Sequence, residues 1–333
     1  LDRVNVALTA YGNKTRDYGA QLIQDYEYER GSLQGDVQVA LSDRMGLAGT
    51  IGYDEVDTTA RASFLAEDQL SGVFWNAGFR FTPGRKTDML IKYGRRYDND
   101  FIDGYIRYDV TERIHFAANA SRTFQTRALA SATQYQALQR RTLDFVDNLR
   151  AGGSGDAGDI VNALTRVARQ RFGVQQIGLG VANNVNATLA GAFGRTTVSM
   201  SGHYRDVDYG YREIETIGVT LGLRRAMSRR MSAYSNIFYR HVDSAADLTS
   251  CLADPTLFFL DPTVPGFDAA LSCNAVIGFQ GDNSTVGGRI GLSYRVYQNV
   301  SAFGEYSHTE RFSQNAAQEY GENTVTAGLQ LEF

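Results

Sequence analysis

The sequence predicts an all-β protein, an antiparallel transmembrane β-barrel of about 14 strands (range about 14–16), and three observations lead to this prediction. Apolar residues recur at every second position in blocks of about ten residues, the period of a strand with one apolar face. Short turns alternate with long connections along the chain. The composition, with 34 Gly, 4 Pro, 19 Tyr and 18 Phe in 333 residues, suits many strands joined by tight turns.

The composition also argues against other classes of protein. No run of about 18 apolar residues is present, so no helix is expected to span a membrane. The net charge of −4 gives no reason to expect a nucleic acid as partner. Two cysteines and four histidines are too few for a disulfide scaffold or a structural zinc site, and we expect no metal and no cofactor. Because the chain begins at Leu1 rather than Met, we expect it to be processed, and earlier strands could precede it.

Each alternating block predicts one strand with its apolar residues on the outward face. In the first half of the chain the blocks cover residues 4–10, 37–41, 47–53, 73–81, 89–93, 102–108 and 114–120. In the second half they cover residues 177–193, 198–204, 217–223, 233–239, 286–294, 300–306 and 325–333. The blocks therefore predict a single barrel over residues 1–333.

The connections between the blocks predict the orientation. Short turns are expected at Ser42–Met45, Thr82–Thr87, Asp109–Arg113, Gly194–Thr196, Arg225–Arg230 and Tyr297–Asn299, and we assign them to the periplasm. Long loops near 12–31, 54–71, 122–176, 205–212, 242–284 and 307–322 then face outside, with 97–100 a short exception. This assignment places both termini in the periplasm. It also groups the outward aromatic residues into two belts, Tyr53, Tyr204, Tyr239 and Tyr306 near the outer rim and Phe81, Tyr108, Phe193, Tyr294 and Phe333 near the inner one.

A large soluble β-sandwich or a solenoid would also alternate, but it explains neither the alternating connection lengths nor the end of the chain. The last block, Thr324–Phe333, ends on an aromatic residue after an outward Val-Ala-Leu-Leu row. It resembles the C-terminal strand by which the barrel assembly machinery recognises outer-membrane proteins. We therefore favour the barrel, located in a bacterial outer membrane, with Phe333 as its assembly signal.

One segment departs from the strand period. From Thr126 to Arg150 the apolar residues recur at spacings of three and four, which predicts an amphipathic helix. A second helix is expected after Asp159, a favourable N-cap, and the helical insert spans 126–172. It is either a hairpin on the rim or a plug folded into the lumen, and we favour the plug because a hairpin would leave its apolar stripe uncovered.

Three segments resemble a known family. They are Trp75–Arg96, Leu143-Asp-Phe-Val and Asn184–Ser199, and they look like the beta-barrel porin 2 group and the related outer-membrane proteins found with exosortase and exopolysaccharide gene clusters. This resemblance implies an outer-membrane barrel associated with the secretion of surface polysaccharide.

The residues at the inward positions of the alternating blocks are expected to form the wall of the lumen. Basic residues dominate it: Arg80, Lys92, Arg96, Arg107, Arg205, Arg240, Arg289 and Arg295, against Asp103 and Glu305. The acidic residues concentrate in the predicted loops, at Asp54, Glu55, Asp57, Asp206, Asp208, Asp254, Asp261 and Asp268. A basic wall would select anionic solutes. The alternative is that these side chains only pair with acids and water to satisfy a polar interior.

Two candidate sites are rejected on the sequence. Glu305, Ser307, His308 and Glu310 cluster on one strand, but Ser307 and His308 are neighbours and point to opposite faces, which prevents a nucleophile–base hydrogen bond. We therefore expect no catalytic residues and no enzyme. Asp254, Asp261 and Asp268 do not match the spacing of a calcium loop.

These observations predict a passive outer-membrane pore or conduit, with exopolysaccharide as the expected cargo. The alternative is a non-conducting barrel that scaffolds other envelope components. Expected partners are outer-membrane lipid, lipopolysaccharide, the barrel assembly machinery, an anionic polysaccharide and periplasmic export components. Cys251 and Cys273 lie 22 residues apart in one outer loop, in a compartment where thiols oxidise, so we expect a disulfide.

Overall fold

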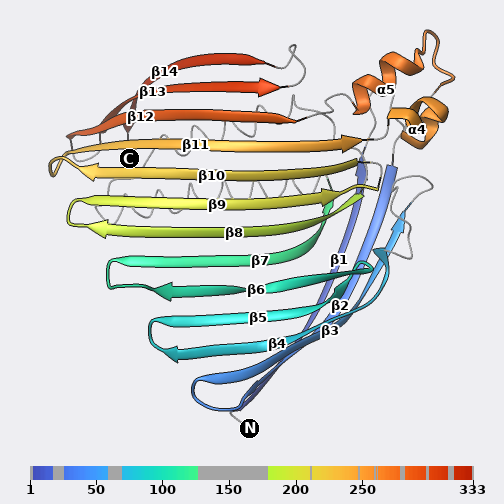
Figure 1. Ribbon diagram of the computed structural model, residues 1–333, viewed down its shortest axis with the longest axis horizontal. Coiled ribbons are helices and arrows are strands. Elements are labelled where there is room, and N and C mark those ends of the chain that lie inside the picture. Colours follow the sequence, from blue (N-terminus) through green and yellow to red (C-terminus); the bar gives the residue numbers. More distant parts are fainter. Residues whose placement is uncertain are drawn as a thin grey trace.

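The computed structural model describes residues 3–17, 26–58, 70–126, 179–210, 212–246, 248–258, 260, 262–277, 282–297, 300–313 and 319–331. Fourteen antiparallel strands form one sheet in which every strand pairs with its neighbour in sequence (Figure 1). This strand number and order confirm the predicted fold class. The strands are β1 (Val4–Asp17), β2 (Tyr26–Ala40), β3 (Met45–Thr58), β4 (Gly72–Gly84), β5 (Thr87–Arg96), β6 (Asn99–Asp109), β7 (Ile114–Thr126), β8 (Leu179–Phe193), β9 (Thr196–Asp208), β10 (Arg212–Ala226), β11 (Met231–Ala246), β12 (Asn283–Tyr297), β13 (Val300–Ser313) and β14 (Tyr320–Leu331).

Strand β3 shows how the local sequence sets the two faces. Leu47 and Ile51 point to one face and are 51% and 64% exposed, whereas Thr50 and Asp54 point to the other and are 7% and 2% exposed. Successive side chains of a strand alternate between the faces of the sheet, so an apolar residue at every second position produces one apolar face. We call the apolar face the outer face and the opposite one the inner face.

The turns predicted to be periplasmic all connect strands at one end of the sheet, the turn end, whereas Tyr97–Asp98 and 209–211 are short connections at the opposite end. Three of the turns at the turn end share a motif in which a hydroxyl closes the turn. The Oγ of Ser42 accepts hydrogen bonds from the N–H groups of Arg44 and Met45. The Oγ1 of Thr111 and the Oγ of Ser228 do the same with the N–H groups two and three residues later. Because these bonds form within four residues, the turn positions are encoded locally.

The opposite end, the loop end, differs from prediction in the extent of its loops. The strands run further than the apolar blocks indicate. The connections predicted near 12–31 and 54–71 are therefore shorter than expected, since β1 extends to Asp17 and β3 to Thr58. The predicted loop near 205–212 is wrong, since only 209–211 separate β9 from β10. Polar residues continue these strands beyond the apolar band, because the hydrogen bonds that pair two strands join backbone groups and do not require apolar side chains.

The connection between β11 and β12 carries helices that the sequence analysis does not predict: α4 (Leu248–Ala253), η1 (Pro255–Phe258) and α5 (Ala269–Ile277). The predicted disulfide is confirmed, because Cys251 of α4 is bonded to Cys273 of α5, and both are fully buried. Figure 1 shows the two helices together beyond the loop end of the sheet. In the described part of the chain, none of the helices has the length and apolar content needed to cross a membrane.

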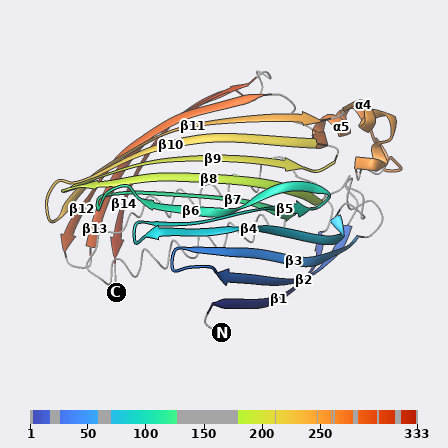
Figure 2. The same ribbon diagram turned by 60° about the horizontal axis from the view of Figure 1, so that its bottom comes forward.

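The sheet curves strongly, so that β1–β3 run at a steep angle to the C-terminal strands (Figures 1 and 2). β1 and β14 are its two edges, and no pairing between them is present among the described residues. The predicted insert, 126–172, falls almost entirely on 127–178 and lies outside the described residues, as does Phe333. Thr126 and Leu179, which flank that segment, are paired directly with each other.

Candidate functional site

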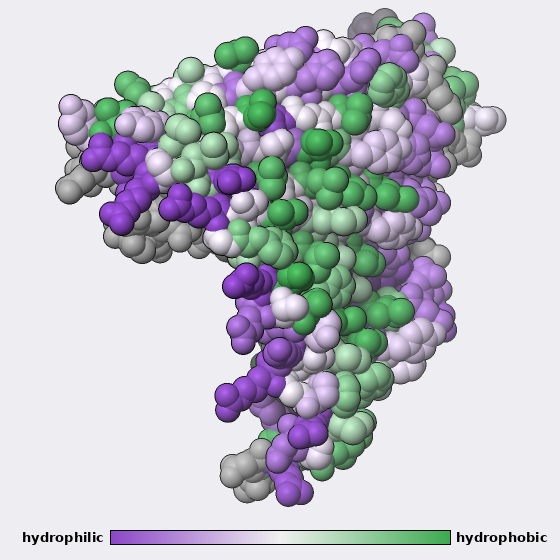
Figure 3. Space-filling view, turned by 60° about the vertical axis from the view of Figure 1, so that its left-hand side comes forward, coloured by the Kyte–Doolittle hydropathy of each residue, from purple (hydrophilic) through white to green (hydrophobic). Residues whose placement is uncertain are grey.

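The outer face of the sheet is a lipid-facing surface. Large apolar side chains are exposed along it, including Leu8 at 77%, Val325 at 78% and Leu329 at 71%. Figure 3 shows hydrophobic side chains gathered in a band across the strands, with hydrophilic side chains on both sides of it. A soluble monomer does not expose an apolar surface of this extent. Antiparallel sheets with this lipid-facing alternation belong to bacterial outer membranes, where the protein is located.

Aromatic residues border this band at the predicted levels. Tyr53, Tyr204, Tyr239 and Tyr306 are 36–48% exposed on the outer face. The first three lie in the half of their strand nearer the loop end, and Tyr306 lies at the middle of β13. Tyr108, Phe193 and Tyr294 are 43–49% exposed and lie near the turn end. Such amphipathic rings prefer the interface between lipid and water.

The inner face of β1–β7 carries basic residues that are paired with acids. The guanidinium of Arg80 donates to the Asp88 carboxylate over 3.0 and 3.2 Å, from Nε and Nη2. Lys92 Nζ lies 2.7 Å from Asp103 Oδ2. Arg107, another predicted wall residue on these strands, stacks on a ring, with its Cζ 5.4 Å from the centroid of Tyr105. This half of the wall therefore has its charges largely neutralised.

A buried ion-pair cluster closes the loop end of the same half. Arg96 donates to both oxygens of Asp54, over 2.7 and 2.9 Å, and Arg30 Nη2 lies 3.5 Å from Asp54 Oδ1. Arg30 also donates to the Tyr97 hydroxyl over 2.8 Å. Burial raises the pKa of Tyr97 to about 12. The cluster joins β2, β3 and β5 and the turn that follows β5.

Aromatic rings surround this cluster. Arg96 Cζ lies 4.0 Å from the ring centroid of Phe74, and Arg30 Cζ lies 5.0 Å from that of Phe124. The β6–β7 ladder stops at Gly104–Ala120, and beyond that point Phe124 packs against the Tyr28 and Tyr97 rings. When a guanidinium lies between a carboxylate and an aromatic ring, the carboxylate pairs with its charge and the ring covers its flat face.

The assignment of Asp54 to an acidic outer loop is therefore wrong. Asp54 is an inward residue of β3, and its two arginine partners explain why this carboxylate can be only 2% exposed. Asp206 and Asp208 are also strand residues, at the loop end of β9. The sequence analysis misses Arg30, although the alternation of β2 assigns it to the inner face.

The inner face of β8–β14 has a different charge balance. Arg289 lies 3.8 Å from Glu305, which also accepts a hydrogen bond of 2.7 Å from the Tyr234 hydroxyl. At the positions whose side chains are described, the inward arginines of these strands are Arg205, Arg224, Arg240, Arg289, Arg295 and Arg311, and the inward carboxylates are Glu305 and Glu322. This half of the wall is net positive. Arg224, Arg311 and His203 are additions to the predicted set, all of which the alternation could have identified.

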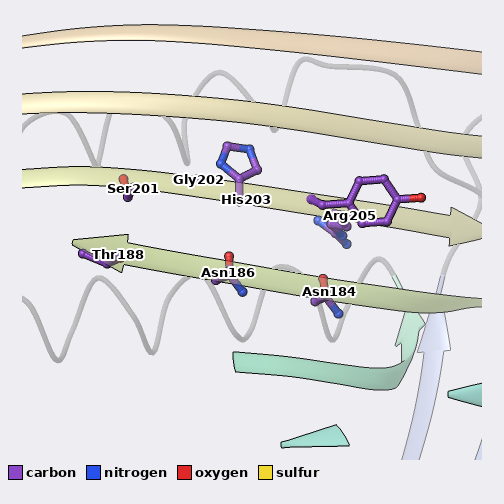
Figure 4. Close-up of a pocket in the computed structure, with 8 residues that line it drawn as sticks. Asn184, Asn186, Thr188, Ser201, Gly202, His203 and Arg205 are labelled. Atoms are coloured by element: carbon purple, nitrogen blue, oxygen red, sulfur yellow. The ribbon is translucent and has the colours of Figure 1, made fainter. Parts of the chain in front are cut away.

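A hollow of about 230 Å³ lies on this positive wall between β8 and β9. Its lining comes from both strands: Asn184, Asn186 and Thr188 of β8, and Ser201, Gly202, His203, Tyr204 and Arg205 of β9 (Figure 4). Most of these side chains are short and polar, and the long ones are His203, Tyr204 and Arg205. The hollow thus combines hydrogen-bonding groups with one guanidinium.

The rejected Ser–His pair stays separated. His308 is on the outer face, where its Nδ1 lies 2.9 Å from Asn323 Oδ1, and Ser307 is directly opposite Arg289 on the inner face. The geometry thus provides no nucleophile–base contact between them.

No protein-family model matches the chain, and no curated protein does. Several solved structures share its general architecture at low identity. They include a loop deletion mutant of OmpT, an outer membrane protein of Vibrio cholerae (8% identity, 99% of each chain, TM-score 0.37), and a bacterial polysaccharide outer membrane secretin (9% identity, 100% of this chain and 87% of that one, TM-score 0.35). A third is a mutant of the TodX monoaromatic hydrocarbon channel (13% identity, 99% and 79%, TM-score 0.30). At these TM-scores the similarities carry no argument about function.

Proposed function

We propose that the protein is a passive outer-membrane pore that selects anionic solutes, and that an acidic exopolysaccharide is its cargo. The observation that carries this proposal is the difference between the two halves of the inner face. On β1–β7 several inward charges form close acid–base pairs, whereas at the described inward positions of β8–β14 arginines outnumber carboxylates. In a confined path a surplus of fixed charge produces a potential of several kT, which concentrates ions of opposite sign.

Reversal potentials in planar bilayers test the selectivity. Under a KCl gradient, the native protein should prefer chloride, and the combined substitution of Arg107, Arg205, Arg240 and Arg295 by Gln should weaken or invert that preference. The matched control is Arg80→Gln with Asp88→Asn, which removes a neutral pair and should leave the preference unchanged. Equal permeability of the native pore to both ions would contradict the proposal.

Salt concentration provides a second check on the same proposal. The Debye length is about 10 Å at 0.1 M salt and about 3 Å at 1 M. An electrostatic preference should therefore be clear at low salt and fade at high salt. A preference that is independent of salt would point to steric selection instead.

The alternative function is a non-conducting scaffold. It predicts no conductance from purified protein under any of these conditions, and the pore predicts discrete channel openings. Single-channel recording therefore separates the two functions.

We also propose that the insert is a lumenal plug. Because Thr126 and Leu179 pair directly, a four-residue turn could join them after deletion of 127–178 without loss of a strand. If the insert occupies the lumen, this deletion should raise the single-channel conductance several-fold. An unchanged conductance would instead favour a hairpin on the rim.

Lipopolysaccharide, the assembly machinery and periplasmic export components remain proposed partners. For the assembly signal, deletion of Phe333 should slow insertion into the membrane, measured as the fraction of heat-modifiable, folded protein over time. Insertion of the deletion variant at the native rate would show that Phe333 is not the assembly signal.

A further inference from the structure

We propose that the turn end of the sheet binds carboxylated polysaccharide chains through six basic residues on the inner side of its rim: Arg3, Arg44, Lys86, Arg113, Arg195 and Arg230. We call these six residues the basic rim. None of them belongs to the predicted wall of the lumen. The inference rests on the proposed function, because it names the place where the cargo of the pore first binds.

The residues of the basic rim share one structural position. Each directly precedes a strand that runs away from the turn end, and these strands are β1, β3, β5, β7, β9 and β11 (Figure 1). The seventh strand of this direction, β13, follows Asn299, which lies outside the described residues. The position is therefore basic in all six strands for which the structure describes it.

Backbone hydrogen bonds hold the basic rim in the ladder of the sheet. The carbonyl oxygen of each rim residue accepts a hydrogen bond of 2.7–2.8 Å from the N–H group of the neighbouring strand. The donors, in the order of the rim residues, are Ala40, Thr82, Asp109, Ala192, Ala226 and Arg295. Each rim residue is followed by a residue at an outward position, such as Val4 or Met45, so the rim residues are at inward positions.

The side chains of the basic rim are available to a ligand. All six are exposed, and in the described part of the chain none of them forms an ion pair. Ala or Thr is opposite four of the six, which leaves space beside the charged groups. An approaching anion therefore does not have to displace a carboxylate from them.

Basic residues also outnumber acids around the rim. The described turns and the last position of the ladder at this end contain three acids, Asp43, Asp109 and Glu112. The Oδ1 of Asp109 already lies 2.6 Å from the Nδ1 of His115. The basic residues at the same positions are the rim itself and Arg85, Arg229 and Arg295. The turn end is thus net positive, and rings of basic side chains are an arrangement that anion-conducting pores use.

The spacing of the rim favours a long chain over a small anion. The rim residues are on alternate strands, and neighbouring strands are about 4.8 Å apart, so successive rim positions are about 10 Å apart. A single exposed ion pair contributes little. A chain with many carboxylates can contact several rim residues, because the first contact holds the rest of the chain at a high effective concentration. Arginine can bind each carboxylate in a bidentate manner.

Fluorescence anisotropy of labelled oligosaccharides tests the basic rim. The protein is placed in nanodiscs of phosphatidylcholine at 0.1 M salt, so the measurement does not require conduction. The native protein should bind decagalacturonate at least tenfold more tightly than trigalacturonate, which reaches fewer rim residues. Neutral maltodecaose, of the same length as the decamer, should also bind at least tenfold more weakly.

Two triple variants locate the binding site. Arg44→Gln with Arg113→Gln and Arg195→Gln should raise the Kd of decagalacturonate at least tenfold. The matched control is Arg85→Gln with Arg225→Gln and Arg229→Gln, which removes the same charge from exposed positions at the same end but outside the rim. It should raise the Kd by less than threefold. Heat-modifiable mobility checks that each variant is folded, and if a triple variant does not fold, its single substitutions are compared in the same assay.

The outcomes separate the basic rim from the pore. No binding of decagalacturonate, equal binding of the trimer and the decamer, or equal weakening by the two triple variants would overturn the rim, while the chloride preference still decides the pore. If the protein does not conduct, the pore is refuted and anisotropy alone decides the rim. Tight binding of the decamer that the rim variant loses and the control variant keeps supports it.

Discussion

At the scale of single residues, the burial of an ion pair determines how much that pair stabilises the inner wall. Asp54 is 2% exposed and contacts two guanidinium groups, whereas the Arg80 and Asp88 side chains are 45% and 28% exposed. A buried charge that loses its partner keeps the full cost of desolvation. A more exposed charge that loses its partner is solvated by water, so the same substitution costs little.

We therefore expect Asp54→Asn to destabilise the folded protein by about 3–5 kcal/mol, because it leaves Arg96 and Arg30 without their carboxylate. The matched substitution Asp88→Asn should cost less than about 1 kcal/mol. Urea unfolding in lipid vesicles, followed by tryptophan fluorescence, measures both. Similar losses for the two variants would show that the Asp54 cluster does not stabilise the loop end.

A second residue-scale prediction concerns the turn between β5 and β6. Tyr97 and Asp98 both have positive φ, 54° and 56°, which is the conformation of a type I′ hairpin turn. Asp and Gly tolerate this region, and β-branched residues do not. Asp98→Val should be less stable than Asp98→Gly by about 1–2 kcal/mol, with the native protein between them or equal to the Gly variant. The same unfolding assay checks it, and a Val variant as stable as the Gly variant would contradict this backbone conformation.

At the scale of elements, the turns and the disulfide loop are organised by short-range chemistry, while the strands depend on their neighbours. The turns at Ser42, Thr111 and Ser228 close on their own hydroxyl groups. Helices α4 and α5 are held together by the Cys251–Cys273 bond, and their loop makes up most of the connection between β11 and β12. The effects of a change in either feature should therefore remain local.

The disulfide should order its loop without stabilising the sheet. Closing a loop of this length contributes about 3 kcal/mol by the chain-entropy estimate. Residues 247–282 contain no Lys or Arg, so chymotrypsin rather than trypsin is the suitable probe. Cys251→Ser with Cys273→Ser should accelerate cleavage in this loop at least tenfold and leave the unfolding midpoint of the sheet unchanged. A lower midpoint would show that the loop packs on the barrel.

At the scale of the whole molecule, the free edges of β1 and β14 present the main physical problem. Both edges carry exposed outward apolar residues, so both lie in the hydrocarbon region. Unpaired backbone groups there cost several kcal/mol each, which is why membrane-spanning sheets close. β1 runs toward the loop end and β14 toward the turn end, so the two edges are antiparallel and complementary.

We expect β1 and β14 to pair in the membrane with their apolar residues on the same face. In a Cys251→Ser, Cys273→Ser background, Leu8→Cys should form a disulfide with a cysteine at one of the outward positions Val325, Ala327 and Leu329. Cysteine at Gly328, which points inward, is the matched control and should not react with it. Failure at all three outward positions would mean that another strand or chain covers these edges.

The sequence by itself determined the features that depend on near neighbours. The two-residue period assigned residues such as Leu8, Ile51 and Leu329 to the outer face, because the alternation of side chains is a property of each strand. The turns follow from Ser, Thr, Gly and Pro within a few residues, and a single pair of cysteines allows only one internal disulfide. The same period identified the predicted basic residues of the inner wall. It would also have identified Arg30, Arg224, Arg311 and His203.

Only the tertiary structure decided which charges are paired. Asp54, Arg30 and Arg96 come from three strands, and their contact depends on strand registers, on the true length of β3 and on the curvature of the sheet. These are set by pairing between distant segments, which a local pattern does not contain. The alternation thus identified a basic wall. The structure added close acid–base pairs on β1–β7 and showed that arginines outnumber carboxylates at the described inward positions of β8–β14.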